Sequence, residues 1–162
     1  MSKLSIWEQT KSMVVVWSYQ DDQQMRAFVK AIDHFLQQKK FAHALIIVNI
    51  PKELDKKTLP PHFLIYYNSP ADYTMFGKLK DVQLEAELQK NFDLLLWFGT
   101  PDSKIKGLLK KSKIKQWLGI NEIDPQFDML LDTQQNTPEA QLEFIQQTLQ
   151  RIQSWTNSKA QA

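Results

Sequence analysis

Met13-Val-Val-Val-Trp17 is the stretch of sequence that decides the fold. It is apolar throughout and rich in β-branched residues, and it shows no alternation with polar residues, which indicates a strand buried on both faces. Three similar runs are predicted strands, at residues 44–48, 63–67 and 93–98. Two less regular segments are also predicted strands, at residues 115–120 and 127–131.

Amphipathic segments separate these strands. Apolar residues recur at helical spacing over 22–39, and the preceding Asp21-Asp22 pair can cap that helix. Shorter helices are predicted over 82–92 and after Thr100-Pro101, where Thr suits the cap position and Pro the first helical position. Thr137-Pro138 opens the last helix in the same way. The apolar stripe of that helix consists of Leu142, Ile145, Leu149 and Ile152.

This alternation of helices with fully apolar strands predicts an α/β fold. We expect a three-layer sandwich in which a mostly parallel sheet of five or six strands has helices on both faces, as in Rossmann-like or flavodoxin-like proteins. The length of 162 residues matches one domain, which we place at residues 1–156. A tail at residues 157–162 should fray.

The composition excludes several kinds of site. The sequence has no cysteine, which excludes disulfides, thiolate nucleophiles and cysteine-bound metals. Its four glycines never reach the spacing of a dinucleotide-binding fingerprint, a phosphate-binding P-loop or a G-x-S-x-G nucleophile elbow. We therefore predict no cofactor. No apolar run approaches the ~20 residues that cross a bilayer, so a cytoplasmic location and no membrane partner are expected.

The three histidines are predicted to have structural or solvent-exposed roles. His34 falls on the polar face of its helix, whereas His43 and His62 lie at strand beginnings. In an open parallel sheet the ligand usually binds at the opposite edge, outside the carboxyl ends of the strands. We therefore assign no catalytic residue and no metal ligand among them.

Six residues at or near that carboxyl edge are candidate ligand-binding residues. They are Tyr19, Asp21, Lys78, Thr100, Ser103 and Lys104. Hydroxyl groups and lysines at this edge could bind an anionic substrate. The alternative for Asp21 is a helix cap, and a carboxylate at the positive end of a helix disfavours a bound phosphate.

Phe76-Gly77-Lys78 is the most unusual local feature, because it lies in an irregular stretch where glycine often has a positive φ. One interpretation is that the turn presents Lys78 to a ligand. The other is that the turn buries Phe76 and leaves Lys78 in solvent.

Six lysines occur in residues 104–115, and no acidic residue lies between Ser103 and Asn121. We interpret them as the solvated face of a helix whose Ile and Leu residues are buried, and contact with an anionic partner is the alternative. This helix carries no exposed Trp or Phe that could anchor it in lipid. Nucleic-acid binding is not expected, because the chain has only two arginines.

Four motifs stand in a recognisable order along the second half of the chain. They are Phe76-Gly-Lys78, Phe92-Asp-Leu-Leu-Leu96, Ser112-Lys-Ile-Lys-Gln-Trp-Leu-Gly119 and Phe127-Asp-Met-Leu-Leu131. In this order the segment 63–152 resembles a family of small uncharacterised bacterial proteins known only as a domain of unknown function. That resemblance covers over half the chain and implies no activity.

A fainter likeness connects the segments 93–98 and 115–119 with the N-terminal half of heptosyltransferase-type glycosyltransferases. Such enzymes resemble two Rossmann-like halves, and the second holds most of the sugar nucleotide. This chain is too short to contain that second half, so the likeness implies a lone acceptor-side half.

Two functions are open at this point. The first is a non-catalytic module that binds a small ligand or a protein partner, which accounts for the missing catalytic motifs. The alternative is a small enzyme, or a degenerate half-glycosyltransferase, that acts on a sugar-nucleotide or phosphorylated substrate.

Phe144 and Trp155 share a face of the last helix outside its main stripe. These two aromatic side chains could form the contact of a homodimer. Alternatively, both rings pack against the sheet or against the N-terminal Ile6-Trp7 segment.

Overall fold

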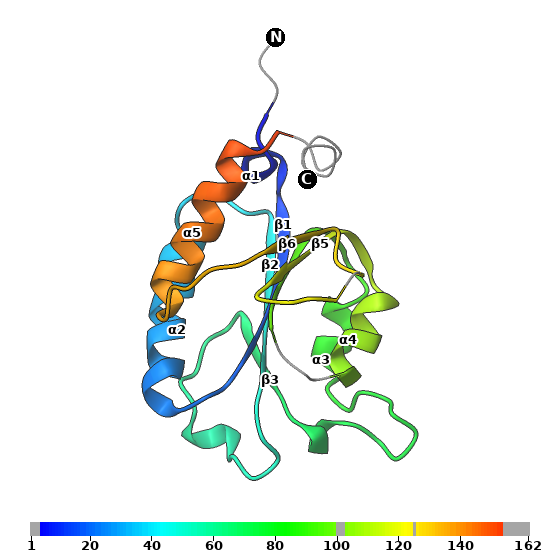
Figure 1. The fold of residues 1–162 in the computed structure, drawn as a ribbon. Helices are drawn as coiled ribbons and strands as arrows, with labels where there is room; N and C mark the ends of the chain where they lie inside the picture. The colour runs from blue at the N-terminus through cyan, green and yellow to red at the C-terminus, as the bar shows by residue number, and fades with distance from the viewer. Residues whose placement is uncertain (1–3, 100–102, 125, 154–162) are drawn as a thin grey trace.

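The structure is a computed structural model, and it describes residues 4–99, 103–124 and 126–153 (Figure 1). In chain order its elements are α1 (Ile6–Gln9), β1 (Ser12–Ser18), α2 (Asp22–Leu36), β2 (His43–Asn49), β3 (Ile65–Asn68), α3 (Val82–Glu87), β4 (Asn91–Phe98), α4 (Ser103–Lys110), β5 (Lys113–Ile120), β6 (Met129–Leu131) and α5 (Pro138–Arg151). Two short 3-10 turns, Lys56–Thr58 and Pro70–Asp72, flank β3.

The six strands form one sheet in the order β3-β2-β1-β4-β5-β6, and every neighbouring pair is parallel. The predicted α/β class is thereby confirmed, and the strand order is consistent with a Rossmann-like fold. From β1 the chain continues to β2 and β3 on one side of β1, and it then crosses to β4 on the other side. The strand order therefore switches between β1 and β4, where ligands of such sheets usually bind.

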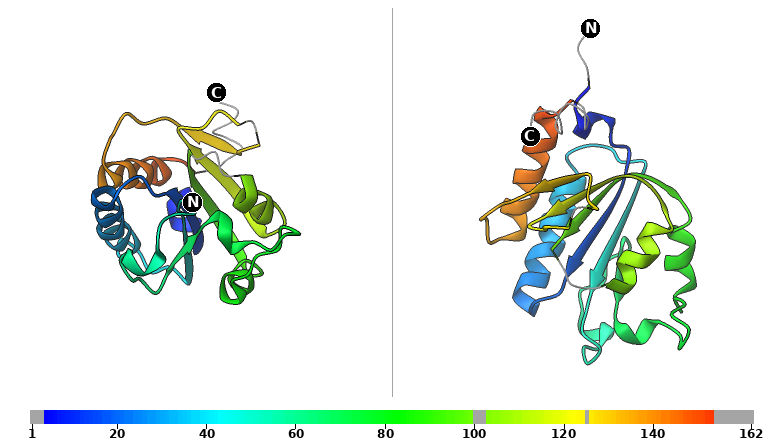
Figure 2. Two further views of the ribbon diagram at one scale, coloured as in Figure 1. Left: turned by 90° about the horizontal axis from the view of Figure 1, so that it is seen from below. Right: turned by 45° about the vertical axis from the view of Figure 1, so that its right-hand side comes forward.

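Helices cover both faces of the sheet (Figure 2). Helices α1, α2 and α5 pack with one face in a cluster that we call the α2/α5 cluster. Helices α3 and α4 pack with the other face in the α3/α4 cluster. Strand β1 supplies Val15 to the first and Val16 to the second, and both side chains are fully buried. Burial on both faces is the reason that β1 is apolar at every position from 13 to 17.

The predicted helix caps are confirmed where the structure describes them. The Asp21 carboxylate accepts a hydrogen bond of 2.7 Å from the backbone N–H of Gln24, at the start of α2. The Thr137 hydroxyl accepts one of 3.2 Å from Ala140, with Pro138 in the first turn of α5. Each cap satisfies an N–H group that the helix itself leaves without a partner.

Several predicted boundaries were wrong. Strand β3 begins at Ile65 and not at residue 63, because Phe63 is 89% exposed and lies outside the sheet. Helix α2 ends at Leu36, three residues early, and α3 ends at Glu87, since β4 already begins at Asn91. The edge strand β6 spans three residues of the five predicted.

Helix α1 was not predicted from the sequence. Its cap is reciprocal: the Ser5 hydroxyl accepts from the N–H of Glu8, and the Glu8 carboxylate accepts from the N–H of Ser5. The helix buries Trp7, whose ring meets those of Phe35 and Phe41 edge-on at 5.2 and 5.6 Å between centroids. The Lys39 ammonium donates to the carbonyls of Trp7 and Thr10 at the end of this helix.

Candidate functional site

Two of the residues predicted to bind a ligand, Tyr19 and Asp21, lie at the carboxyl edge of the sheet, just after β1. Tyr19 follows β1, and its hydroxyl donates a hydrogen bond of 2.8 Å to Asp22. That bond raises the pKa of Tyr19, with smaller contributions from burial and from the charges of Asp22 and Asp21. Asp21 is occupied as the cap of α2. The two predicted residues after β1 are thus engaged with the start of α2.

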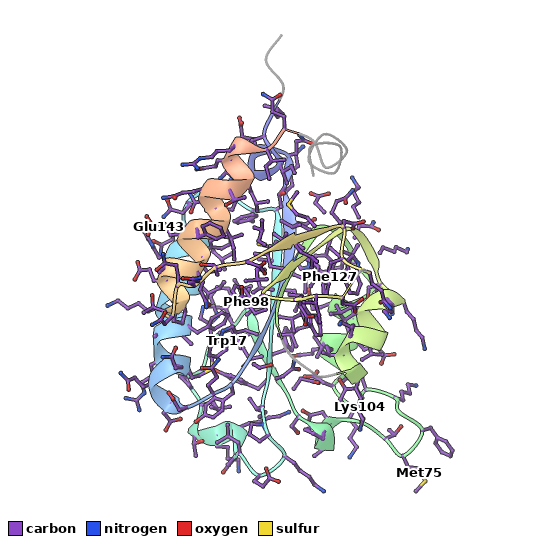
Figure 3. All side chains as sticks on the ribbon, in the orientation of Figure 1. Trp17, Met75, Phe98, Lys104, Phe127 and Glu143 are labelled. Atoms are coloured by element: carbon purple, nitrogen blue, oxygen red, sulfur yellow. The ribbon has the colours of Figure 1, made fainter. Side chains whose placement is uncertain are left out.

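The other candidates lie apart from Tyr19. Lys104, on α4, places its ammonium 5.3 Å from the centre of the Tyr73 ring, on the α3/α4 side of the sheet (Figure 3). Tyr19 packs against the α2/α5 cluster on the other side. Lys78 is exposed on the turn that follows β3. Thr100 and the side chain of Ser103 lie outside the described residues.

A row of polar side chains crosses the carboxyl ends of β1, β2 and β3. Ser18 pairs in register with Asn49, and Asn49 with Asn68. All three are expected to point toward the α3/α4 side, because Val16 and Ile47, two positions earlier, lie in that cluster. Asn68 accepts a hydrogen bond of 2.7 Å from the buried Tyr73 hydroxyl.

Two members of this row have buried polar atoms without partners. Asn49 is 8% exposed, and neither its amide oxygen nor its amide nitrogen has a hydrogen-bond partner in the described structure. The same is true of the Ser18 hydroxyl, on the neighbouring strand. Because a buried unpaired polar group costs ~1–3 kcal/mol, such a pair beside the switch point marks a place where binding can recover free energy.

A cavity of about 520 Å³ lies at the opposite, amino edge of the sheet. Its floor is formed by the starts of β2 and β3, and the ends of α2 and α3 flank it. Three aromatic side chains line it: Phe41, Tyr66 and the highly exposed Phe63. Small-molecule sites usually have volumes of roughly 300–1,000 Å³ and apolar or aromatic walls. We call this space the amino-edge cavity.

The polar lining of the amino-edge cavity centres on Glu87. One of its oxygens lies 3.0 Å from His43 Nε2 and the other 3.0 Å from Lys90 Nζ. The His43 ring stacks on Phe92 at 5.0 Å. Burial and the charge of Lys90 lower the pKa of His43 despite Glu87, so the imidazole is neutral at pH 7.

Lysines give the amino-edge cavity a positive charge. Lys39, Lys40 and Lys90 line it, against the single carboxylate of Glu87. Burial lowers the pKa of Lys39, and its ammonium is engaged with the α1 carbonyls. Lys40 is exposed and has no ion-pair partner among the described residues. The cavity therefore favours a ligand that carries negative charge over one that carries positive charge.

The sequence matches a family model over residues 2–152, described as a family of unknown function (DUF6913). The chain belongs to this family. No curated protein and no solved structure matches it. The expected membership of an uncharacterised family is thus confirmed, and the match carries no activity with it.

Other features of this DUF6913 domain bear on the predicted sites. No group of three or more His, Asp or Glu residues that could hold a metal occurs among the described residues. No described helix is long and apolar enough to cross a membrane. His34 is exposed and lies 3.4 Å from Glu139, whereas the His62 side chain is 9% exposed and lies 2.6 Å from Asp33.

Of the two predicted interface residues, the structure describes one. Phe144 is partly buried and packs against the α2/α5 cluster. Trp155 lies outside the described residues. The homodimer itself stays a prediction.

Sequence reasoning missed the amino-edge cavity of this DUF6913 chain. It placed His43 at a strand beginning correctly but gave it no ligand, because the usual site of such folds is at the other edge. No signal for it was available, because Phe63 belongs to the predicted strand 63–67 and its exposure is known only from the structure.

Proposed function

We propose that this domain is a non-catalytic binding module and that the amino-edge cavity takes a small aromatic anion. The observation that carries the proposal is the cavity itself, in which Phe41, Phe63 and Tyr66 stand beside Lys40 and Lys90. Aromatic walls bind a planar apolar group, and the excess of lysines selects a negative one.

The position of Phe63 supports this role. Its ring is 89% exposed and stacks on His62 at 5.5 Å, and His62 is in turn held by Asp33 at 2.6 Å. Because the Phe63 ring is exposed, its removal should not lower the stability of the fold. Its position allows the ring to cover a ligand. A ligand that seats beside it removes the ring from water, which favours binding.

The test is a titration with naphthalene-2-sulfonate, followed by backbone amide chemical shifts. We expect saturable binding, with the largest shifts at residues that line the amino-edge cavity. Phe63→Ser and Lys40→Gln should each weaken binding by about five- to tenfold. Phe76→Ser is the matched control, because Phe76 is 91% exposed and does not line the amino-edge cavity.

Two comparison ligands sharpen this test. Methanesulfonate lacks the ring, and 2-naphthylmethylammonium carries the opposite charge. Equal affinity for the ammonium compound would contradict the charge argument. Absence of saturable binding by the sulfonate would end the proposal for this cavity.

A second candidate function is a small enzyme, or a degenerate half-glycosyltransferase, that acts at the carboxyl edge on a sugar-nucleotide or phosphorylated substrate. Its support is the pair of unpartnered groups on Ser18 and Asn49, with Lys104 on the same side of the sheet. Asp21 weighs against phosphate, because its carboxylate already occupies the start of α2.

Thermal unfolding in the presence of UDP-glucose or inorganic phosphate separates the two candidates. A ligand at 100 times its dissociation constant adds about 2.7 kcal/mol to stability. If the carboxyl edge binds, Asn49→Ala abolishes the rise in melting temperature and Lys40→Gln leaves it intact. No rise with either compound would count against binding of these substrates at the carboxyl edge. A bacterial origin and a cytoplasmic location stay predictions.

A further inference from the structure

The turn between β3 and α3 exposes two large apolar side chains. Met75 is 92% exposed and Phe76 is 91% exposed, and Met75 lies at the outermost point of this turn (Figure 3). One sequence-based interpretation had Phe76 buried, and this interpretation was wrong. The ring was expected to pack inward as most large aromatics do, but the turn directs it into solvent.

This turn is closed by its own hydrogen bonds. The Thr74 N–H donates 2.7 Å to the Lys78 carbonyl, and the Gly77 N–H donates 2.9 Å to the Thr74 carbonyl. Gly77 has a φ of +80°, a backbone conformation that is unfavourable for residues with a Cβ atom. Tyr73 and Leu79, paired across the base of the turn, are buried in the α3/α4 cluster. The base is therefore anchored in the core while the tip is held out in solvent.

Positive charge surrounds the exposed tip. A groove of about 340 Å³ brings Phe76 and Lys78 of the turn together with Lys111, just after α4. Lys104, at the start of α4, lies over the Tyr73 ring at the base of the turn. Glu85 is the single carboxylate among the residues that line this groove. The turn thus combines two exposed apolar side chains with three nearby lysines.

We infer that the turn 73–79, with Lys104 at the start of α4 and Lys111 just after its end, forms a docking surface for the headgroup region of an anionic lipid bilayer. The sequence argument against lipid considered α4 alone, which has no exposed aromatic of its own. The structure supplies Met75 and Phe76 from the neighbouring turn. Lysines attract the surface charge, and the two apolar tips enter the interface.

The rigid turn makes this docking favourable. A flexible loop loses conformational entropy when it is ordered at an interface, whereas this turn is already fixed by its hydrogen bonds and its buried base. The groove and the amino-edge cavity share no lining residue, although Gln89 of the groove directly precedes Lys90 of the cavity.

Vesicle flotation tests the inference. The wild-type chain should float with vesicles of phosphatidylcholine and phosphatidylglycerol, remain behind with pure phosphatidylcholine, and be released by high salt. The double variant Met75→Ser/Phe76→Ser should bind at least about tenfold more weakly, because two apolar groups no longer leave water. Each lysine removed, as in Lys78→Gln or Lys111→Gln, should weaken binding about fivefold.

Matched controls exclude non-specific effects. Phe63→Ser removes an equally exposed aromatic, and Lys30→Gln/Lys57→Gln removes two exposed lysines elsewhere. Both should float like the wild type. The inference is overturned if the wild type fails to bind anionic vesicles, if it binds neutral vesicles equally well, or if the Met75→Ser/Phe76→Ser variant is unchanged.

Discussion

At the scale of single residues, Asp93 shows how one carboxylate can fix the relation of two strands. It lies near the start of β4 and accepts hydrogen bonds from the N–H groups of Lys11 at 2.8 Å and Ser12 at 3.2 Å, where β1 begins. The Ser12 hydroxyl accepts in return from the Asp93 N–H. Burial alone would raise the pKa of Asp93, but these backbone bonds and nearby Lys115 together lower it.

Asp93→Ala should lower the free energy of unfolding by about 1–3 kcal/mol at pH 7, because two N–H groups lose their acceptor. The pKa of Asp93 is lower in the folded than in the unfolded state. Its stabilisation is therefore complete above the ordinary carboxyl pKa and is lost as the pH falls through the lower folded value. Urea unfolding at several pH values should show the two proteins converging in acid. Asp132→Ala, at an exposed position, is the control, and a constant gap at all pH values would contradict the argument.

The sequence could not predict such residue-scale contacts. The sequence predicts Asp93 as the first residue of a strand, whereas β4 begins at Asn91, and the partners of Asp93 lie more than 80 positions earlier in the chain. The capping role of Asp21 could be predicted, because a cap acts within three residues. Contacts within a few residues can be predicted from the sequence. Contacts between distant segments can be predicted only when the strand order is known.

At the scale of elements, the end of β4 and the segment after β5 approach closely at Gly99. A Cβ atom on Gly99 would lie 2.9 Å from the Asn121 carbonyl oxygen, and Gly99 itself donates a backbone hydrogen bond of 2.9 Å to Ile120. Asn121 has φ of 56°, so the chain turns sharply there. The backbone at this point has no room for a side chain.

Gly99→Ala should therefore destabilise the fold by about 1–3 kcal/mol, because backbone atoms must move to admit one methyl group. Gly107→Ala is the matched comparison, since its Cβ would meet nothing within 4 Å on the exposed side of α4. There the same substitution should stabilise by roughly 0.5–1 kcal/mol through helix propensity. Thermal denaturation of both variants would reveal opposite signs, and two shifts of the same sign would refute this account.

The strands were predictable to different degrees. Central strands such as β1 and β4 are covered on both sides, so their sequence is apolar at nearly every position. Strand β3 lies at the edge of the sheet, and its start was misplaced because the apolar run continues into the solvent-exposed Phe63. An apolar run in the sequence predicts burial. At β3 the run alone cannot distinguish a buried residue from an apolar residue that faces a ligand or solvent.

At the scale of the whole molecule, the amino-edge cavity could not be predicted. Its lining comes from three separate parts of the chain, at residues 36–44, 63–66 and 87–90. The sequence placed each part near a strand beginning or a helix end, but only the order β3-β2-β1-β4 brings them together. The fold class, by contrast, follows from the alternation of elements alone, because any sheet with both faces covered must be apolar on both.

Phe144 provides a test of how the molecule assembles. Its ring packs against the α2/α5 cluster, so we expect Phe144→Glu to lower the melting temperature of the single chain. We also expect the mass from light scattering to equal that of the wild type. A wild-type mass of two chains that falls to one in the variant would instead support the predicted homodimer.

The Ile6 N–H donates a hydrogen bond of 2.7 Å to the Ile152 carbonyl, so the beginning of α1 and the end of α5 lie together. A short peptide bridge at that point could seal the fold into a ring without disturbing the sheet. New chain ends could then be placed in the exposed 75–77 turn, which would yield a circularly permuted protein with the same architecture.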